Sequence, residues 1–480
     1  MRVELKGLRG VVWINTLIVA MLFLALSAHA GTVSLPQTGQ TTIYATGDDG
    51  WYKAGVAWPS PRFTDNSIAD SNNQTITDNL TGLVWTKDAN LPGGSKTWQE
   101  ALDYVASMNS GAGTYGHTDW RLPNINELES LINAGQANQV TWLNSQGFTN
   151  VQSFIYWSST SYAYFTSNAW FVDMGDMGDG FVNASVKSHS LYVWPVRSGQ
   201  SGAFGNSFIW STGQTTSYAT GDDGALQRGV AWPSPRFTDN GNLTVTDNLT
   251  GLLWMKDAGT PTVGSCTGGY MVWQSALNYV TCLNTANYLG YTDWRLPNIQ
   301  ERFSLVDRGA TSTSGHPFTN IQPDRHGDWS STSYASNTSF AWVVHMDAGH
   351  VFAYDKSYTG YVWPVRSGQV GNLVSLVILK SGTGSGTVTS ASSEINCGAT
   401  CSFPFPQGAS VTLTATADSG STFTGWSGDC SSYGSSSTCT LTMSAAKSVT
   451  ATFNLSCTYA ITPTSKTFTS SGGSDTVSVT

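Results

Sequence analysis

The feature that most constrains this chain is an internal duplication. Residues 56–66 return unchanged at 230–240, and residues 118–124 return at 292–298. Residues 192–199 return at 361–368. A period of this length exceeds that of a solenoid unit and matches the size of a globular domain. The sequence therefore predicts two tandem copies of one self-contained domain.

Each copy predicts an α+β fold. In the first copy, Thr97 with Glu100 and Asn124 with Glu127 have the spacing of capping boxes, which mark helix starts. The second copy keeps the latter box at 298–301. Short segments rich in β-branched and aromatic residues predict strands at 80–85, 169–173 and 192–197.

One helix differs in charge between the copies. Arg302 takes the place of Leu128 on the apolar face of the helix that follows the second capping box. A charge at such a position predicts either a repacked helix or a side chain whose charged end reaches solvent.

A different pattern begins near residue 373. Residues 410–416 and 448–453 alternate apolar and polar side chains, as half-buried antiparallel strands do. This part of the chain predicts a small all-β module, in which disulfides compensate for a thin core.

Seven cysteines occur, all after residue 260. Their spacing suggests the pairs Cys266–Cys282, Cys397–Cys401 and Cys430–Cys439. Cys457 is left over, and we expect its partner in sequence beyond residue 480. Zinc ligation is the alternative, but the chain has no CxxC pair and no cluster of His and Cys.

The N-terminus predicts export. Arg2, Lys6 and Arg9 precede an apolar stretch, and Ala28 and Ala30 form a small-x-small cleavage pattern. The uninterrupted apolar run is half the length that a membrane-spanning helix needs, so we expect no span after cleavage. We expect a secreted protein, either extracellular or held at a bacterial cell surface, in which the cysteines form disulfides.

The expected segments follow from these signals. They are a signal peptide over 1–30, a first repeated domain over 31–200, a second over 201–371, a β module over 372–455 and an incomplete β-sandwich over 456–480. Glycine-containing segments at 199–202 and 368–371 predict flexible joints between them.

Charge excludes a nucleic-acid partner. The chain has 22 Lys and Arg against 31 Asp and Glu, and no basic block occurs in it. Binding to phosphates needs clustered cations. No pattern predicts an oligomeric state.

Two groups of residues are candidates for binding. The motif TGDDG occurs in both copies, so Asp48, Asp49, Asp222 and Asp223 are the candidate ligands for a calcium ion, with a plain turn as the alternative. Most of the 19 Trp are expected in the core. Trp170 and Trp342 are the candidates for stacking on sugar rings, if late loops expose their indole faces.

Several motifs in order resemble the Lcl C-terminal domain family. They are DNLTGLVW at 78–85, DWRLPN at 119–124, WSST at 157–160 and the VWPVR segment at 193–197, with their counterparts in the second copy. The resemblance covers roughly residues 38–370. It implies a C-type-lectin-like fold and a role in adhesion, for which sulfated glycans are the partners of the adhesin that names the family. The family's disulfides and glycan site are not carried over, because Pro195 and Pro364 stand where relatives often have a cysteine.

The C-terminal part carries weaker resemblances. Residues 380–453, with GSGTV, CGATC and FTGWSG, resemble a divergent InlB-B-type bacterial repeat. Residues from 457 onward resemble the start of a BACON-like or immunoglobulin-like module. Such modules are typical stalks of surface proteins.

These observations predict a secreted or cell-surface binding protein without catalytic activity. Its partner would be an extracellular glycan or a matrix or surface protein, and the net charge of −9 disfavours sulfated polyanions. A purely structural matrix component is the alternative. A sulfatase-modifier-like oxidase or a hydrolase is disfavoured, because no duplicated Ser/His/Asp set or reactive thiol pair occurs. No cofactor is expected apart from the candidate calcium ion.

Overall fold

The chain divides into two compact units, residues 1–370 and 371–480. The computed structural model describes residues 33–175, 179–198, 209–310, 316–322, 327–366, 373–390, 395–397, 401–406, 410–456 and parts of 461–479. The expected signal peptide and the expected joints at 199–202 and 368–371 lie outside these residues. No helix among the described residues is long and apolar enough to cross a membrane.

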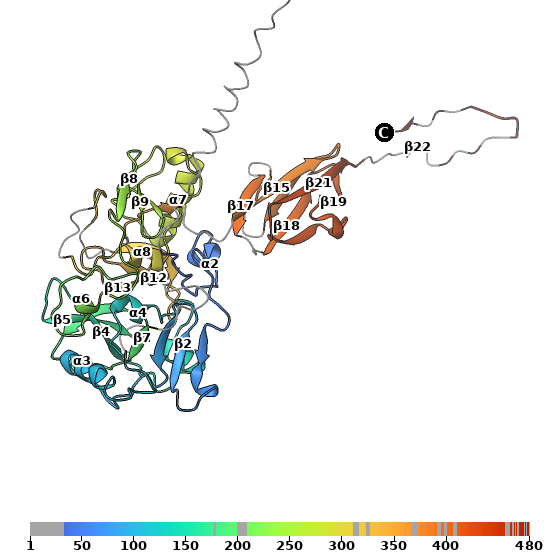
Figure 1. Ribbon diagram of the computed structural model, residues 1–480. Helices are drawn as coiled ribbons and strands as arrows, with labels where there is room; N and C mark the ends of the chain where they lie inside the picture. Colours follow the sequence, from blue (N-terminus) through green and yellow to red (C-terminus); the bar gives the residue numbers. More distant parts are fainter. Residues whose placement is uncertain are drawn as a thin grey trace, which may run out of the picture. The chain divides into compact units, whose positions relative to one another are not determined.

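Short helices and short strands alternate in the first repeat (Figure 1). Its elements are α2 (Asp49–Tyr52), β1 (Phe63–Asp65), η1 (Asn66–Ile68), β2 (Thr75–Asp78), β3 (Leu83–Thr86), α3 (Trp98–Ser107), α4 (Ile125–Glu129), α5 (Gln139–Ser145), β4 (Ile155–Ser161), β5 (Asn168–Asp173), β6 (Val182–Val186) and β7 (Val196–Ser198). Both predicted capping boxes are present, at the starts of α3 and α4.

The second repeat has the same order of strands and, apart from α5, the same order of α-helices, while the short 3-10 helices η1 and η2 differ in position. Its elements are α6 (Asp223–Leu226), β8 (Phe237–Asp239), β9 (Thr244–Asp247), β10 (Leu253–Met255), α7 (Trp273–Thr285), η2 (Tyr288–Gly290), α8 (Ile299–Ser304), β11 (Asp328–Ser333), β12 (Phe340–Val344), β13 (Val351–Asp355) and β14 (Val365–Arg366). Among its described residues, no helix corresponds to α5.

The two repeats share a sheet. Each repeat has a four-stranded sheet of its own, in the orders β1-β2-β3-β7 and β14-β10-β9-β8. A third sheet, β11-β12-β13-β6-β5-β4, runs through both repeats, and its halves meet where Val351 of β13 pairs with Val182 of β6. The repeats therefore form one unit, which differs from the predicted pair of self-contained domains, because each repeat completes the sheet of the other.

Tryptophan fills both cores, as expected. Trp85 and Trp194 pack edge to face at 5.7 Å between ring centroids in the first repeat. Trp254 and Trp363 repeat this contact at 5.5 Å in the second. All four side chains are fully buried, and such pairs stabilise a core beyond the area that they bury.

Arg302 excludes one of the two predicted alternatives, a side chain whose charged end reaches solvent. The side chain is fully buried. Asp328, which lies 2.6 Å from it, balances its charge. In the first repeat, Leu128 and Tyr156 occupy these two positions and are also fully buried. The second repeat has thus replaced a neutral buried pair by a charged one, since a buried charge needs an opposite charge beside it.

The second unit is an all-β module, as predicted. Its strands are β15 (Leu373–Ser381), β16 (Gly386–Ser390), β17 (Ser402–Pro406), β18 (Ser410–Ala417), β19 (Ser421–Gly428), β20 (Thr438–Thr442) and β21 (Lys447–Leu455), with η3 (Ser431–Tyr433) between β19 and β20. They form two sheets, in the orders β17-β15-β21-β19 and β16-β18-β20. Beyond them, β22 (Ile461–Thr462) pairs with β23 (Ser478–Val479). Most of the remaining 457–480 segment, including Cys457, lies outside the described residues.

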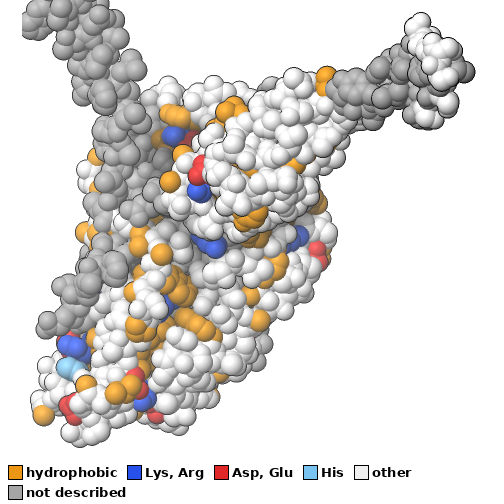
Figure 2. Space-filling model, turned by 90° about the vertical axis from the view of Figure 1, so that its right-hand side faces the viewer, with side chains coloured by type: hydrophobic (Ala, Val, Ile, Leu, Met, Phe, Trp, Pro, Cys, Tyr) orange, Lys and Arg blue, Asp and Glu red, His pale blue; other side chains and the backbone are white. Residues whose placement is uncertain are grey.

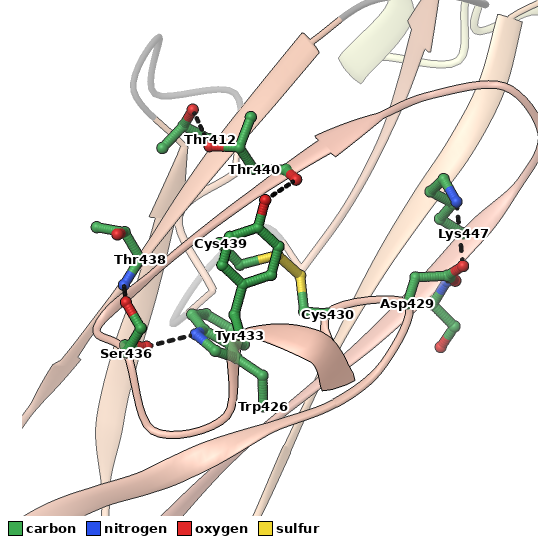
Figure 3. The surroundings of a disulfide bond; sticks show 11 residues. Thr412, Trp426, Asp429, Cys430, Tyr433, Ser436, Thr438, Cys439, Thr440 and Lys447 are labelled. Carbon is green, nitrogen blue, oxygen red and sulfur yellow. Dashed lines mark hydrogen bonds and ion pairs between the residues drawn. A yellow bond between two sulfur atoms is a disulfide. The ribbon is translucent and has the colours of Figure 1, made fainter.

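All three predicted disulfides are present. Around Cys430–Cys439, the Trp426 indole donates to the carbonyl of Ser436 and the Tyr433 hydroxyl donates to that of Thr440 (Figure 3). The disulfide thus closes a turn whose aromatic side chains are themselves hydrogen-bonded.

The surface of the molecule has few charges. In the face drawn in Figure 2, charged side chains are isolated among uncharged ones, and hydrophobic side chains are scattered over it. This agrees with a composition in which 11% of residues are charged.

Candidate functional site

The TGDDG motifs form helix starts that join the two repeats. Asp48 caps α2, with Oδ1 accepting from Trp51 N at 2.8 Å and Oδ2 accepting from Tyr44 N at 2.8 Å. The next residue, Asp49, is buried and accepts hydrogen bonds from the hydroxyls of Thr38, at 2.5 Å, and of Thr332 in the second repeat, at 2.8 Å.

The second motif makes the equivalent contacts from the second repeat to the first. Asp222 caps α6 and accepts from Ala225 N at 2.9 Å. Asp223 accepts from Thr212 at 2.6 Å and from Thr160 of the first repeat at 2.7 Å. We call residues 33–54 and 209–228 the arms, because each connects its motif to the other repeat.

The arms are also held through their backbones. The Asn298 side chain donates to the carbonyl of Ala54, and the Asn124 side chain donates to that of Arg228. In Figure 1, α2 accordingly lies beside α8 of the second repeat, and α6 lies beside α4 of the first. The contacts are reciprocal, so the unit has an approximate twofold relationship between its halves.

A lysine covers each arm. Lys187 Nζ lies 3.9 Å from the centroid of the Trp98 ring and 5.1 Å from that of Tyr218, which belongs to the second arm. Lys356 makes the same contacts with Trp273 and Tyr44. Partial burial lowers the pKa of both lysines to about 8.

These contacts replace the calcium interpretation of Asp48, Asp49, Asp222 and Asp223. Calcium takes six to eight oxygen ligands, whereas each carboxylate here accepts hydrogen bonds from N–H or O–H donors. Burial raises the pKa of Asp49 and that of Asp223 to about 7, which disfavours the ionised ligand that a cation needs. No group of three or more His, Cys, Asp or Glu side chains among the described residues could hold a metal ion.

The two candidate stacking residues are buried. Trp170 is 1% exposed and Trp342 is 3% exposed. Both lie on central strands of the shared sheet, β5 and β12, instead of on exposed loops. This corrects the expectation that their indole faces are available at the surface.

Trp170 nevertheless lines a cavity. The cavity has a volume of about 200 Å³ and lies mostly against the second repeat, with Tyr162, Tyr164 and Trp170 contributed by the first. Its aromatic wall on the second repeat consists of Trp232, Phe237, Phe318 and Trp363. Aromatic rings of both repeats thus surround this open space.

Polar atoms in the cavity wall lack partners. Arg308 is 3% exposed; its Nη1 donates to the carbonyl of Gly349 at 2.5 Å and its Cζ lies 4.0 Å from the Trp170 ring centroid. Its Nη2 is buried without a hydrogen-bond partner among the described residues, as is Oδ1 of Asp347. Burial lowers the pKa of Arg308 to about 9, the largest opposing influence being Glu129. An unpaired buried donor and acceptor cost free energy unless something fills them.

The corresponding place in the first repeat is filled. There, Trp142 of α5 lies 6.0 Å from Trp58 and 5.9 Å from Phe63 between ring centroids, with the Arg62 guanidinium 5.8 Å from the Trp142 centroid. The segment that carries α5, residues 133–150, is four residues shorter in the second repeat, at 307–320. The cavity thus lies in the repeat whose described residues include no counterpart of α5.

The cavity wall provides groups that can bind a ligand. The described residues that line it include no Ser, Thr, Cys or Lys. The cysteines nearest in sequence, Cys266 and Cys282, are joined in a disulfide. This arrangement can hold a ligand by apolar contact, cation–π contact and hydrogen bonds.

Comparison with known families agrees with this architecture. The Lcl C-terminal domain matches residues 74–197 and again residues 243–366, which together make up more than half of the chain. The chain belongs to the Lcl C-terminal domain family. The divergent InlB B-repeat domain matches residues 377–457. No curated protein matches the chain.

The Lcl C-terminal domains are typical of surface or extracellular proteins, as are InlB-like repeats, and neither type is known as catalytic. Both Lcl matches begin after the arms. The segments that join the two repeats therefore precede the family's own domain in each half.

Sequence reasoning missed the cavity and its key arginine. Arg308 stands where the first repeat has Ala134, and this difference accompanies the four-residue deletion. Aligning the two repeats against each other would have found both signals, because a residue that departs from its duplicate marks a place where the copies have diverged.

Proposed function

We propose that this Lcl C-terminal domain protein is a secreted or cell-surface binding protein without catalytic activity. It adheres to an extracellular glycan or to a matrix or surface protein through its duplicated, C-type-lectin-like domains. The observation that carries the proposal is the cavity of the second repeat, where aromatic rings surround one guanidinium nitrogen of Arg308 and one carboxylate oxygen of Asp347 that have no hydrogen-bond partner among the described residues.

The two repeats have different roles in this proposal. The first repeat, whose corresponding place Trp142 fills, supports the shared sheet and supplies Trp170 and Tyr162 to the cavity. The second repeat supplies the remaining wall and binds the ligand. The β module would hold this unit away from its attachment point, and the three disulfides suit an oxidising environment.

A purely structural role is the second candidate. It is favoured by the way in which the two repeats share one sheet and exchange hydrogen bonds through their arms. A structural component would need that rigidity but no open cavity.

The test is binding of the secreted chain to an array of neutral and acidic glycans and of matrix proteins. Wild type is compared with Ala163→Trp, which places a ring in the cavity beside Tyr162. We expect at least one partner whose binding falls at least tenfold in the variant. Retention by no partner, or retention that Ala163→Trp leaves unchanged, would reject this site and favour the structural role. N-terminal sequencing of the exported product checks cleavage after Ala30.

A further inference from the structure

We propose that the cavity of the second repeat takes an indole-type aromatic ring, either a tryptophan side chain of a partner polypeptide or a small aromatic molecule. This inference rests on the proposed function and names the chemistry that the same site recognises. It is based on the first repeat, in which the ring of Trp142 fills the corresponding place.

The receiving surface is the same in both repeats. Residues 56–66 and 230–240 are identical, so Trp58, Arg62 and Phe63 have their counterparts in Trp232, Arg236 and Phe237. The guanidinium lies over the Trp ring at 4.1 Å in the first repeat and at 4.0 Å in the second.

In the first repeat this surface receives an indole. The ring of Trp142 packs against those of Trp58 and Phe63, and α5 presents it from a separate helix. Because the identical surface in the second repeat has kept its geometry, we infer that it retains its preference for a ring of this kind.

The described residues of the second repeat leave this surface more open. Phe63 is 6% exposed, whereas its counterpart Phe237 is only partly buried. Among the described residues, no aromatic ring pairs with Trp232 in the way that Trp142 pairs with Trp58. An apolar surface that its own chain leaves open gains free energy when a ligand covers it.

The volume of the cavity limits the size of the ligand that it can hold. A cavity of about 150 Å³ takes a benzene molecule, and pockets for drug-sized ligands measure roughly 300–1,000 Å³. At about 200 Å³, this cavity takes one ring system and not an oligosaccharide.

The polar atoms match a tryptophan residue better than a sugar. Asp347 Oδ1 can accept from one N–H, and Arg308 Nη2 can donate to one carbonyl. An indole has one N–H, and its peptide group has the carbonyl. Arg236, which also lines the cavity, has a further unpaired donor in its Nη1. A pyranose carries hydroxyls around its whole edge, and the aromatic rings of the wall offer them no partner.

Calorimetry and NMR titration of the full chain test this inference. The probes are N-acetyl-L-tryptophanamide, N-acetyl-L-leucinamide and N-acetylglucosamine. We expect one site for the tryptophanamide and at least tenfold weaker binding of the other two. Ala163→Trp should abolish the site.

The matched variant is Trp142→Ala, which opens the corresponding place in the first repeat. We expect it to bind two equivalents of the tryptophanamide instead of one. If the variant is too unstable for titration, the amide should raise its melting temperature more than that of wild type, because it restores the missing ring.

The source of the ring is tested with a peptide that spans residues 137–146, which carries Trp142. Tighter binding of the peptide than of the amide indicates a polypeptide partner, and equal binding indicates a small aromatic ligand. Cavity binding of N-acetylglucosamine without the tryptophanamide would overturn this inference and leave the proposed function intact. If no probe binds and the array partners bind Ala163→Trp as they bind wild type, both fail.

Discussion

The two repeats have the same fold and differ in what fills them. Where the first repeat has a neutral buried pair, Leu128 and Tyr156, the second has Arg302 and Asp328. Where the first has α5 with Trp142, the second has a cavity with Arg308 in its wall. The contacts of the shared sheet and of the arms recur in both repeats almost atom for atom. The comparison therefore indicates that these parts tolerate little change, while the other surfaces of the repeats are free to diverge.

The largest effect is expected from separating the repeats. Residues 31–200 and 201–370, produced alone, each lose the strand and the arm that the other half supplies. We expect neither to behave as a folded monomer, and co-expression to give a one-to-one complex, as measured by size-exclusion chromatography with light scattering. Two stable monomers would show that the shared contacts are dispensable.

Next in size is the loss of the buried ion pair. Arg302→Leu removes the cation that lies beside the buried carboxylate of Asp328, so we expect a loss of about 3–5 kcal/mol in the free energy of unfolding. The double variant Arg302→Leu, Asp328→Tyr recreates the pair of the first repeat and should recover most of this loss. Urea unfolding measures the free energy of unfolding of both variants. Equal stability of the single and the double variant would contradict the idea that the two pairs can replace each other.

The disulfide of the second repeat comes third. Cys266 and Cys282 have no counterparts in the first repeat. Replacing both by Ser frees a loop whose ends are 16 residues apart, and we expect a loss of about 2–4 kcal/mol. The cavity and the tryptophanamide site should survive, as a thermal shift with the probe would reveal. An unchanged melting temperature would mean that the loop is held by its other contacts.

The last effect is a dependence of stability on pH. Folding raises the pKa of Asp49 and of Asp223 to about 7, from an unfolded value near 4, so the folded state binds more protons between these values. The stability that these two groups contribute is therefore present below about pH 4 and is lost as the pH rises to 7. We expect the stability of the double variant Asp49→Asn, Asp223→Asn to fall less between pH 5 and pH 7 than that of wild type. Melting temperatures at these two pH values measure the difference. An identical pH dependence in both proteins would refute the assignment of the decline to these two carboxyl groups.

Much of the architecture could be predicted from the residues. The capping boxes at Asn124 and Asn298, the alternating strands of the β module and the three disulfides are local signals, and the structure confirms each of them. The buried state of most tryptophans follows from the cost of exposing indole surface.

The candidate site could not be predicted in the same way. TGDDG is a turn and helix-start signal wherever it occurs, and only the fold brings Thr332 and Thr160 to its second aspartate. Trp170 and Trp342 lie on β5 and β12, the middle strand of each half of the shared sheet, and only the packed fold shows that both indoles are buried there.

By itself, the sequence determined that there are two related halves, where their helices begin and which cysteines pair, because these depend on residues close together along the chain. Only the tertiary structure decided that the halves form one unit and that one of them keeps an open cavity. Those properties depend on side chains more than 100 residues apart, such as Asp49 and Thr332, and on a space that α5 fills in one half and no described helix fills in the other.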